Sequence, residues 1–210
     1  VTVNILRYLG ANVSREGNTL IVDATSISRS TILEPQMKEL RSSIMFLGAL
    51  ASRTGQACLY LPGGCDIGLR PIDLHLKGLK ALGYEVFTDG HNVCATRRDV
   101  IGKEIVLPFP SVGATENIMM AAVLAEGTTY LENAAEEPEI VDLANFLNKM
   151  GAKIKGAGTD TIKIEGVDKL GGARHTVIPD RIETGTFMLA AAITKGAVHI
   201  MNAVPDHVKP

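Results

Sequence analysis

Two patterns of hydrophobic and polar positions recur along the chain, and the first combines a helix, a glycine and a hairpin. An apolar helical stretch ends in Leu-Gly or Met-Gly at Gly10, Gly83 and Gly151, which are spaced by 73 and 68 residues. Glycine just past an apolar helix supplies the left-handed conformation of a C-cap, so the chain turns sharply there. Two alternating segments around a small-residue turn follow each glycine and predict a β-hairpin, as over residues 12–22.

The second pattern is an alanine-rich helix followed by a strand. The helices predicted over residues 114–125 and 183–194 are apolar on nearly all sides, which is typical of buried helices. The shared period of about 70 residues predicts an α/β fold built from three repeated units, with three unrelated α/β units as the alternative. The helices of this pattern end at Gly55, Gly127 and Gly196, and the predicted strands cover residues 56–61, 128–132 and 197–201.

The composition excludes several classes of protein. The 210 residues are 46% hydrophobic and 21% charged, as in an ordinary folded protein, and the formal net charge of -2 argues against nucleic-acid binding. The three cysteines and five histidines have no metal-ligand spacing, and the cysteines favour a reducing, cytoplasmic setting. No apolar run reaches the roughly 18 residues of a membrane span, and no signal peptide is recognised. Because the chain opens on Val1 and ends as a new segment begins, we expect a piece of a longer protein.

One cysteine lies on a glycine-rich loop. The run Leu-Pro-Gly-Gly-Cys at residues 61–65 predicts a flexible loop with an exposed thiol at Cys65. Arg70 follows five residues later, and a nearby positive charge lowers the pKa of a thiol toward reactivity. Cys58 and Cys94 fall within predicted strands, where we expect inert, buried side chains. Cys65 is therefore the candidate reactive thiol.

Basic side chains and a helix start are candidate anion-binding groups. Arg41 and Arg70 can bind phosphate or carboxylate in a bidentate manner, although a solvated surface position is the alternative for each. Residues 111–113 precede an apolar helix, and amides at a helix N-terminus attract phosphate. The alternative there is ordinary N-capping by Ser111 or Thr115, and the two roles are compatible.

Two aspartates stand at other predicted helix starts. Asp73 taken alone would be an N-cap of the helix that follows it. Asp180, with Glu183 three residues later, fits a capping box, and a place at the rim of an active site is the alternative.

Four stretches, in this order, resemble the enolpyruvyl transferases that act on UDP-N-acetylglucosamine. They are Leu-Arg-Ser-Ser-Ile at 40–44, the run from Leu61 to His75, Pro-Ser-Val-Gly-Ala-Thr-Glu-Asn at 110–117, and Pro-Asp-Arg-Ile-Glu-Thr-Gly-Thr at 179–186. The resemblance spans the whole chain and about half of the family's length. It implies an inside-out α/β barrel domain of three repeated units. It also implies transfer of the enolpyruvyl group of phosphoenolpyruvate to the 3-hydroxyl of the nucleotide sugar, the first committed step of peptidoglycan synthesis. No metal or organic cofactor is implied.

The resemblance also implies a role for each matching residue. Cys65 would donate a proton to the enolpyruvyl methylene carbon, form an adduct with phosphoenolpyruvate and be alkylated by fosfomycin. Arg70 would contact both substrates, and Arg41 would line the phosphate side of the pocket. Some members have a lysine where Phe109 stands, so one basic contact is missing here. The implied nucleotide-binding residues are Pro71, Ile72, Asp73 and Leu74 around the uracil and ribose, Ser111, Val112 and Gly113 at the diphosphate, and Asp180 at the rim.

The expected domain organisation follows from the resemblance and the repeat. Residues 1–180 would form the domain with the catalytic loop, and 181–210 the helix and strand that begin the second domain of the whole enzyme. Because the first unit lacks its alanine-rich helix and strand, we expect 181–210 to fill that place, within one chain or by exchange between two. Leu189 and Ile193 would then be buried near Ile5 and Leu9.

The expected partners are the two substrates, the missing second domain and, by exchange, a second copy of the chain. We expect the chain alone to be inactive. The alternatives are 3-phosphoshikimate 1-carboxyvinyltransferase, against which the Pro-Gly-Gly-Cys run and the uridine-contacting stretch count, and a non-catalytic nucleotide-sugar-binding module.

Overall fold

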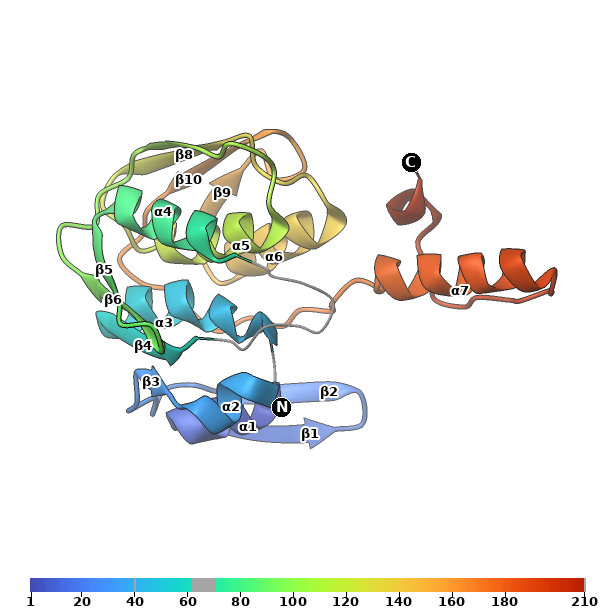
Figure 1. The fold of residues 1–210 in the computed structure, drawn as a ribbon, viewed down its shortest axis with the longest axis horizontal. Helices are drawn as coiled ribbons and strands as arrows, with labels where there is room; N and C mark the ends of the chain where they lie inside the picture. The colour runs from blue at the N-terminus through green and yellow to red at the C-terminus, as the bar shows by residue number, and fades with distance from the viewer. Residues whose placement is uncertain (40, 62–70, 210) are drawn as a thin grey trace.

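The structure, a computed structural model, describes residues 1–39, 41–61 and 71–209 and shows a mixed α/β fold (Figure 1). The helices are α1 (Thr2–Leu9), α2 (Glu34–Glu39), α3 (Phe46–Thr54), α4 (Asp73–Leu82), α5 (Val112–Ala122), α6 (Pro138–Lys149) and α7 (Arg181–Thr194), with the 3-10 helices η1 (Arg41–Met45) and η2 (Pro205–Val208). The strands are β1 (Asn12–Glu16), β2 (Thr19–Asp23), β3 (Thr31–Ile32), β4 (Gln56–Tyr60), β5 (Tyr84–Thr88), β6 (Asn92–Arg97), β7 (Glu104–Val106), β8 (Thr128–Glu132), β9 (Lys153–Lys155) and β10 (Thr161–Glu165). The predicted α/β class is confirmed. In the described ranges, no helix is long and apolar enough to cross a membrane.

The two larger sheets are built in the same way. The first has the order β3-β4-β6-β5 and the second β7-β8-β10-β9. In each, a short strand pairs in parallel with the strand that follows a buried helix, and the next hairpin of the chain adds on antiparallel. The β1–β2 hairpin pairs only with itself among the described strands. Each sheet therefore combines the two parallel strands of one sequence unit with the antiparallel hairpin of the following unit.

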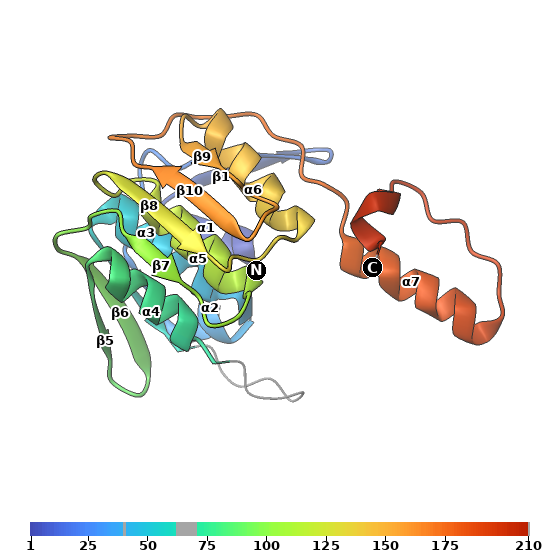
Figure 2. The same cartoon turned by 90° about the horizontal axis from the view of Figure 1, so that it is seen from above.

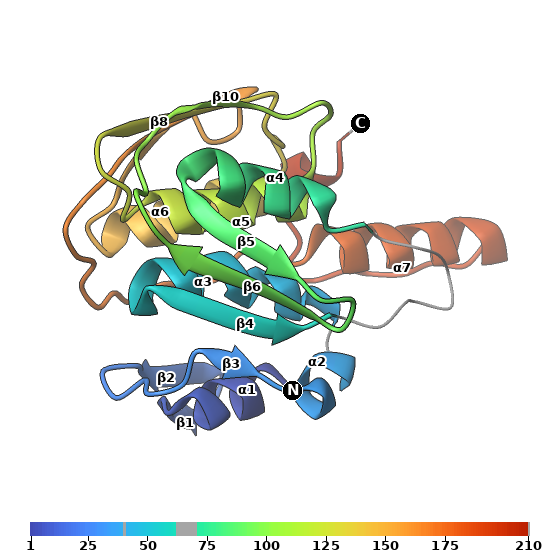
Figure 3. The same cartoon turned by 60° about the vertical axis from the view of Figure 1, so that its left-hand side comes forward.

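The core lies between these sheets, around the alanine-rich helices. Figure 3 shows β4, β6 and β5 in front of α3 and α5, and Figure 1 shows β8 and β10 above α5 and α6. Ala114, Ile118 and Met119 on α5 are all 0% exposed. The small side chains let α3, α4 and α6 approach α5 closely, and the prediction that this helix is buried is confirmed.

Five of the six helix-ending glycines adopt the predicted left-handed backbone, whereas at the end of α7 the left-handed residue is Lys195 and not Gly196. Gly10 has a φ of 107° and Gly83 a φ of 100°, and each ends its helix directly before a hairpin. At Gly83 a Cβ atom would lie 2.2 Å from the carbonyl oxygen of Asp99, so the close packing of the next loop also requires glycine.

The C-terminal helix does not complete the first unit. Leu189 and Ile193 are 73% and 84% exposed, whereas Ile5 and Leu9 are 0% and 1% exposed. Helix α7 packs against η2 and projects away from the rest of the chain in Figures 1 and 2. The expectation that these side chains are buried near Ile5 and Leu9 within one chain is wrong, and residues 197–201 form no strand. The physical reason is that the ion pair between Arg181 and Glu139 ties the start of α7 to α6 and not to the first unit. Exchange between two chains stays a prediction.

Candidate functional site

Three segments far apart in the sequence meet where helices begin. Both α4 and α5 start on the same side of the body, the side toward α7 in Figure 1. A Cβ atom placed on Gly113 would lie 3.1 Å from Cε1 of His75 and 3.9 Å from Sδ of Met45. The first turn of α5 therefore touches the first turn of α4 and the end of η1. The structure thus brings together the predicted binding segments 71–74 and 111–113 and the stretch that follows Arg41.

A buried asparagine holds this junction together. Asn117 is 0% exposed; its Nδ2 donates to the carbonyl oxygen of Ile44 over 3.1 Å, and its Oδ1 accepts from the amide of Gly48 over 2.8 Å. The same Nδ2 lies 3.1 Å from Nδ1 of His75. One side chain thereby links η1, α3, α4 and α5. Asn117 lies in a resembling stretch, and a polar residue among the apolar positions of a buried helix is the signal for such a role.

His75 lies beneath the start of α5 and is a site residue that sequence reasoning missed. The residue is 8% exposed, and burial lowers the pKa of its ring, against a smaller opposing effect of the Asp73 charge. Because Asn117 Nδ2 can only donate, His75 Nδ1 accepts and the neutral ring carries its proton on Nε2. A Cβ on Gly113 would lie 3.4 Å from that Nε2. His75 shares the buried stripe of α4 with Gly78, Leu79 and Leu82, and this spacing was the available signal.

Ser111 is the N-cap of α5, which confirms one of the two predicted capping residues, Ser111 and Thr115. Its Oγ accepts from the amide of Ala114 over 3.4 Å, and its carbonyl oxygen accepts from the amide of Thr115 over 2.9 Å. The amides of Val112 and Gly113 belong to the first turn and have no acceptor within the helix. Such amides, with the positive end of the helix dipole, favour an anion. Capping by Ser111 and anion binding at 112–113 are therefore compatible. Thr115 instead uses its Oγ1 to accept from the amide of Ala135 over 3.1 Å.

Residues 71–74 form the approach to α4 and its first turn. The N-cap is Ile72, with α4 beginning at Asp73, so the interpretation of Asp73 as the N-cap is wrong. Pro71 and Asp73 are exposed, whereas the side chain of Leu74 is 6% exposed and belongs to the core. Asp73 can reach a ligand with its carboxylate, and Leu74 only with its backbone amide.

Asp180 caps α7. Its Oδ1 accepts from the amides of Ile182 and Glu183 over 2.7 and 3.0 Å, which confirms the capping role. The neighbouring Arg181 makes a bidentate pair with Glu139 at the start of α6, with Nε–Oε2 and Nη2–Oε1 distances of 2.9 and 2.8 Å. This pair raises the pKa of Arg181 and lowers that of Glu139, and it ties the first turn of α7 to α6.

Glu116 on α5 is held in an unfavourable environment for a charge. Burial, followed by the nearby carboxylates of Glu139 and Glu137, raises its pKa to about 7. The folded chain therefore binds more protons than the unfolded chain between the ordinary glutamate pKa and about 7. It follows that the contribution of this group to stability is full at low pH and is lost as the pH rises through about 7.

Replacing Glu116 by glutamine is expected to stabilise the chain at pH 8 by about 1–2 kcal/mol, allowing for partial exposure of the carboxyl. The difference should shrink to a few tenths of a kcal/mol at pH 5, where the wild-type group is already protonated. Urea unfolding at the two pH values measures both. Glu104→Gln, at an exposed glutamate on β7, is the matched control and should show no pH-dependent gain. An equal gain at pH 5 and pH 8 would contradict the assignment.

The remaining predicted site residues lie outside what the structure describes. Cys65 and Arg70 fall within residues 62–70, and the side chain of Arg41 is likewise outside the described part. Their assignments stay predictions. Among residues 1–39, 41–61 and 71–209, no group of three or more histidine, cysteine, aspartate or glutamate side chains could hold a metal ion.

Cys65 is expected to be the most reactive thiol of the folded chain, because it alone belongs to a glycine-rich stretch of the sequence with an arginine nearby. Brief treatment of the reduced protein with iodoacetamide, followed by peptide mass spectrometry, measures the three rates. Faster labelling of Cys58 or Cys94 than of Cys65 would refute this expectation.

Comparison with known sequences assigns relatives to the whole chain. A model of the EPSP synthase family (3-phosphoshikimate 1-carboxyvinyltransferase) matches residues 1–209. The UDP-N-acetylglucosamine 1-carboxyvinyltransferase of Finegoldia magna is 53% identical over 212 residues, which cover 100% of this chain and 50% of that protein. The UDP-N-acetylglucosamine 1-carboxyvinyltransferase 1 of Caldanaerobacter subterraneus subsp. tengcongensis is 63% identical over 174 residues, covering 82% of this chain and 42% of that protein. The chain spans about half the length of the curated relatives it matches.

Solved structures share the fold. The enolpyruvyl transferase NikO from Streptomyces tendae superposes with a TM-score of 0.75 at 26% identity, covering 90% of this chain and 45% of that one. EPSP synthase from Acinetobacter baumannii superposes with a TM-score of 0.67 at 23% identity, covering 91% of this chain and 44% of that one, and at this identity it indicates the fold alone.

Proposed function

The chain belongs to the EPSP synthase family, and from this membership we propose that it is one half of a UDP-N-acetylglucosamine enolpyruvyl transferase. The reaction moves the enolpyruvyl group of phosphoenolpyruvate to the 3-hydroxyl of UDP-N-acetylglucosamine and releases phosphate. The observation that carries this proposal is the 53% identity over the whole chain to a relative named for that activity. The proposed place of this activity is the first committed step of peptidoglycan synthesis, in the cytoplasm.

The proposed binding surface is the junction of α4 and α5. The amides of Val112 and Gly113 bind the diphosphate at the start of α5, and residues 71–74 contact the uracil and ribose, with Asp73 contributing its exposed carboxylate. The neutral ring of His75 supports Gly113 from below, so the amides stay in place without adding a buried charge. Asp180 stands at the rim, where its capping of α7 sets the path of the chain.

The proposed chemistry belongs to residues outside the described part. Cys65 donates the proton to the methylene carbon of the enolpyruvyl group, and Arg70 and Arg41 bind the phosphate and carboxylate charges. These roles rest on the resemblance of the stretches that contain them, and no metal or organic cofactor takes part.

The proposed domain organisation is an inside-out α/β barrel over 1–180, with 181–210 beginning the second domain. The exposed apolar side chains of α7, such as Phe187, Leu189 and Ile193, support a partner for that helix, because a patch of this kind is costly to leave in water. That partner is the second domain or, by exchange, another copy of the chain.

The alternative activity, 3-phosphoshikimate 1-carboxyvinyltransferase, is favoured by the description of the family model, while the 53–63% identities to enzymes named for the nucleotide sugar favour our proposal. Titration calorimetry with each acceptor separates the two. We expect saturable heat with UDP-N-acetylglucosamine, weaker binding by Asp73→Ala and unchanged binding by Asp99→Ala, an exposed aspartate in the loop that follows β6. Saturable heat with shikimate 3-phosphate alone would overturn the proposal.

The chain alone is expected to release no phosphate above background when given both substrates, because family catalysis depends on closing two domains over them. A coupled phosphate assay on the purified chain measures this. Turnover would contradict the need for the second half, and nucleotide-sugar binding without turnover would make the isolated chain a binding module.

A further inference from the structure

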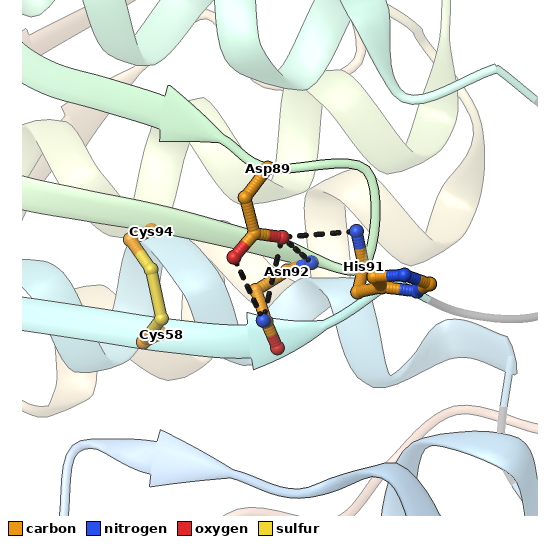
Figure 4. Close-up of a disulfide and its surroundings, with 5 residues drawn as sticks. All are labelled: Cys58, Asp89, His91, Asn92 and Cys94. Atoms are coloured by element: carbon orange, nitrogen blue, oxygen red, sulfur yellow. Dashed lines mark hydrogen bonds between the residues drawn. A yellow bond between two sulfur atoms is a disulfide. The ribbon is translucent and has the colours of Figure 1, made fainter.

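Cys58 on β4 and Cys94 on β6 are joined by a disulfide, as Figure 4 shows. The two residues are direct partners in the antiparallel register, with their Cα atoms 4.0 Å apart. The amide of Cys58 donates away from β6, to the carbonyl oxygen of Ser30 over 2.8 Å. The pair therefore occupies a non-hydrogen-bonded site, where facing residues of an antiparallel pair approach most closely. The sheet register itself brings the two sulfurs together.

The sulfurs lie on the outer face of this sheet. Ala57, Leu59, Val93 and Ala95 point inward and are at most 2% exposed. The alternating residues Cys58 and Cys94 point the other way and are half-buried. The expectation that these two side chains are buried is therefore wrong.

The hairpin turn helps to fix the position of Cys94. At the β5–β6 turn, Asp89 Oδ1 accepts from the amides of His91 and Asn92 over 2.9 and 2.6 Å, and its two oxygens also contact Asn92 Nδ2 (Figure 4). These bonds fix β6 against β5, while burial fixes the hairpin against β4: a one-residue slip along β4 would turn Val93 and Ala95 out of the core. Both cysteines are thus held opposite each other whether or not the bond is present.

We propose that Cys58 and Cys94 form a reversible, oxidant-responsive disulfide site whose reaction partner is a low-molecular-weight disulfide. Partly exposed disulfides are more readily reduced than fully buried structural ones, so exchange with a small thiol in a reducing compartment is favoured. The site is separate from the junction of α4 and α5 and does not depend on the proposed function.

The reaction with glutathione disulfide balances in two steps. The thiolate of one cysteine attacks a sulfur of glutathione disulfide, forming a mixed disulfide and releasing one glutathione thiolate. The second thiolate attacks the protein sulfur of the mixed disulfide, forming the Cys58–Cys94 bond and releasing the second glutathione. The protein loses two electrons and two protons, the electrons reduce glutathione disulfide, and the protons pass to the released thiolates or to water.

The bond ties β4 to β6 across a sequence separation of 36 residues. Closing a loop of this size removes freedom from the unfolded chain, so the bridged form is expected to be the more stable one. For a chain of this length the melting midpoint should rise by roughly 5–15 °C. The register is already set, so the secondary structure should not change.

The test uses the full chain with Cys65→Ser, which leaves only the two cysteines of interest. The protein is equilibrated in glutathione buffers from fully reduced to fully oxidised, approached from both directions, and trapped with N-ethylmaleimide for intact-mass analysis. We expect two labels in reducing buffers, none in oxidising buffers, and the same transition in both directions. Two labels in every buffer, or none even in reduced glutathione, would overturn the proposal.

The single variants Cys58→Ser and Cys94→Ser in the same background are the matched controls. Each is expected to stop at one glutathione adduct and to show no oxidant-dependent rise in melting midpoint. Circular dichroism checks that both variants are folded. Stable glutathione adducts on both cysteines of the parent, without loss of labels to a bridge, would also overturn the proposal.

Discussion

Replacing Asn117 by alanine is expected to lower the free energy of unfolding by about 3 kcal/mol or more. The change leaves the amide of Gly48 and the carbonyl oxygen of Ile44 without their partner in a fully buried place, and each such group costs about 1–3 kcal/mol. It also removes the contact that selects the tautomer of His75. Urea unfolding monitored by circular dichroism measures the loss. Nucleotide-sugar binding should weaken as well, because the starts of α4 and α5 lose their common anchor.

Asn148→Ala is the matched control. Like Asn117, Asn148 forms backbone hydrogen bonds through both ends of its side chain. Its Oδ1 accepts from the amide of Ile154 over 2.8 Å, and its Nδ2 donates to the carbonyl oxygen of Ile154 over 2.9 Å. The residue is exposed, so water replaces both bonds, and a loss of about 1 kcal/mol or less is expected. Equal losses in the two variants would mean that burial is not the source of the effect at Asn117.

Local pattern predicted the elements of the fold well, for identifiable physical reasons. The helix-ending glycines at positions 10 and 83 determine a left-handed cap, and the alternation after them determines a hairpin, so both are encoded within a few residues. The apolar surface of α5 predicted its burial in the same way. The cap at Ser111 was also local, since it needs only a hydroxyl three residues before an amide.

Features that depend on distant partners could not be read from the pattern. The pairing of Cys58 with Cys94 follows from the register between β4 and β6, which no spacing of cysteines reveals. Helix α7 has the same apolar character as α5, but its burial requires partners that the described chain does not place against it. Burial of α7 was therefore predicted from composition and proved wrong. His75 took its place in the site through Asn117, a residue 42 positions away.

Two glycines let α3 and α4 approach α5, and replacing them by alanine is expected to destabilise the chain despite the higher helix propensity of alanine. At Gly48 a Cβ atom would lie 2.3 Å from Oδ1 and 2.5 Å from the carbonyl oxygen of Asn117. Neither atom can yield, because Asn117 is fixed by its bonds to two other segments. We expect Gly48→Ala to cost about 3 kcal/mol or more, at the upper end of overpacking effects.

At Gly78 the obstacle is a side chain, and this difference makes the two glycines separable. A Cβ there would lie 2.2 Å from Cδ1 and 2.3 Å from Cγ1 of Ile118, but 3.7 Å from its Cβ. Gly78→Ala should cost about 1–3 kcal/mol, and in the Ile118→Ala background the cost should largely vanish, because the new methyl fills part of the space left by isoleucine. Ile118→Ala should give no such relief to Gly48→Ala.

Gly185→Ala on α7, where a Cβ meets nothing within 4 Å, is the control and should stabilise its helix by about 0.5–1 kcal/mol. Denaturant unfolding of the single and double variants measures the couplings. Purely additive losses for Gly78→Ala and Ile118→Ala would show that the Ile118 side chain is not what limits the approach of α4 to α5.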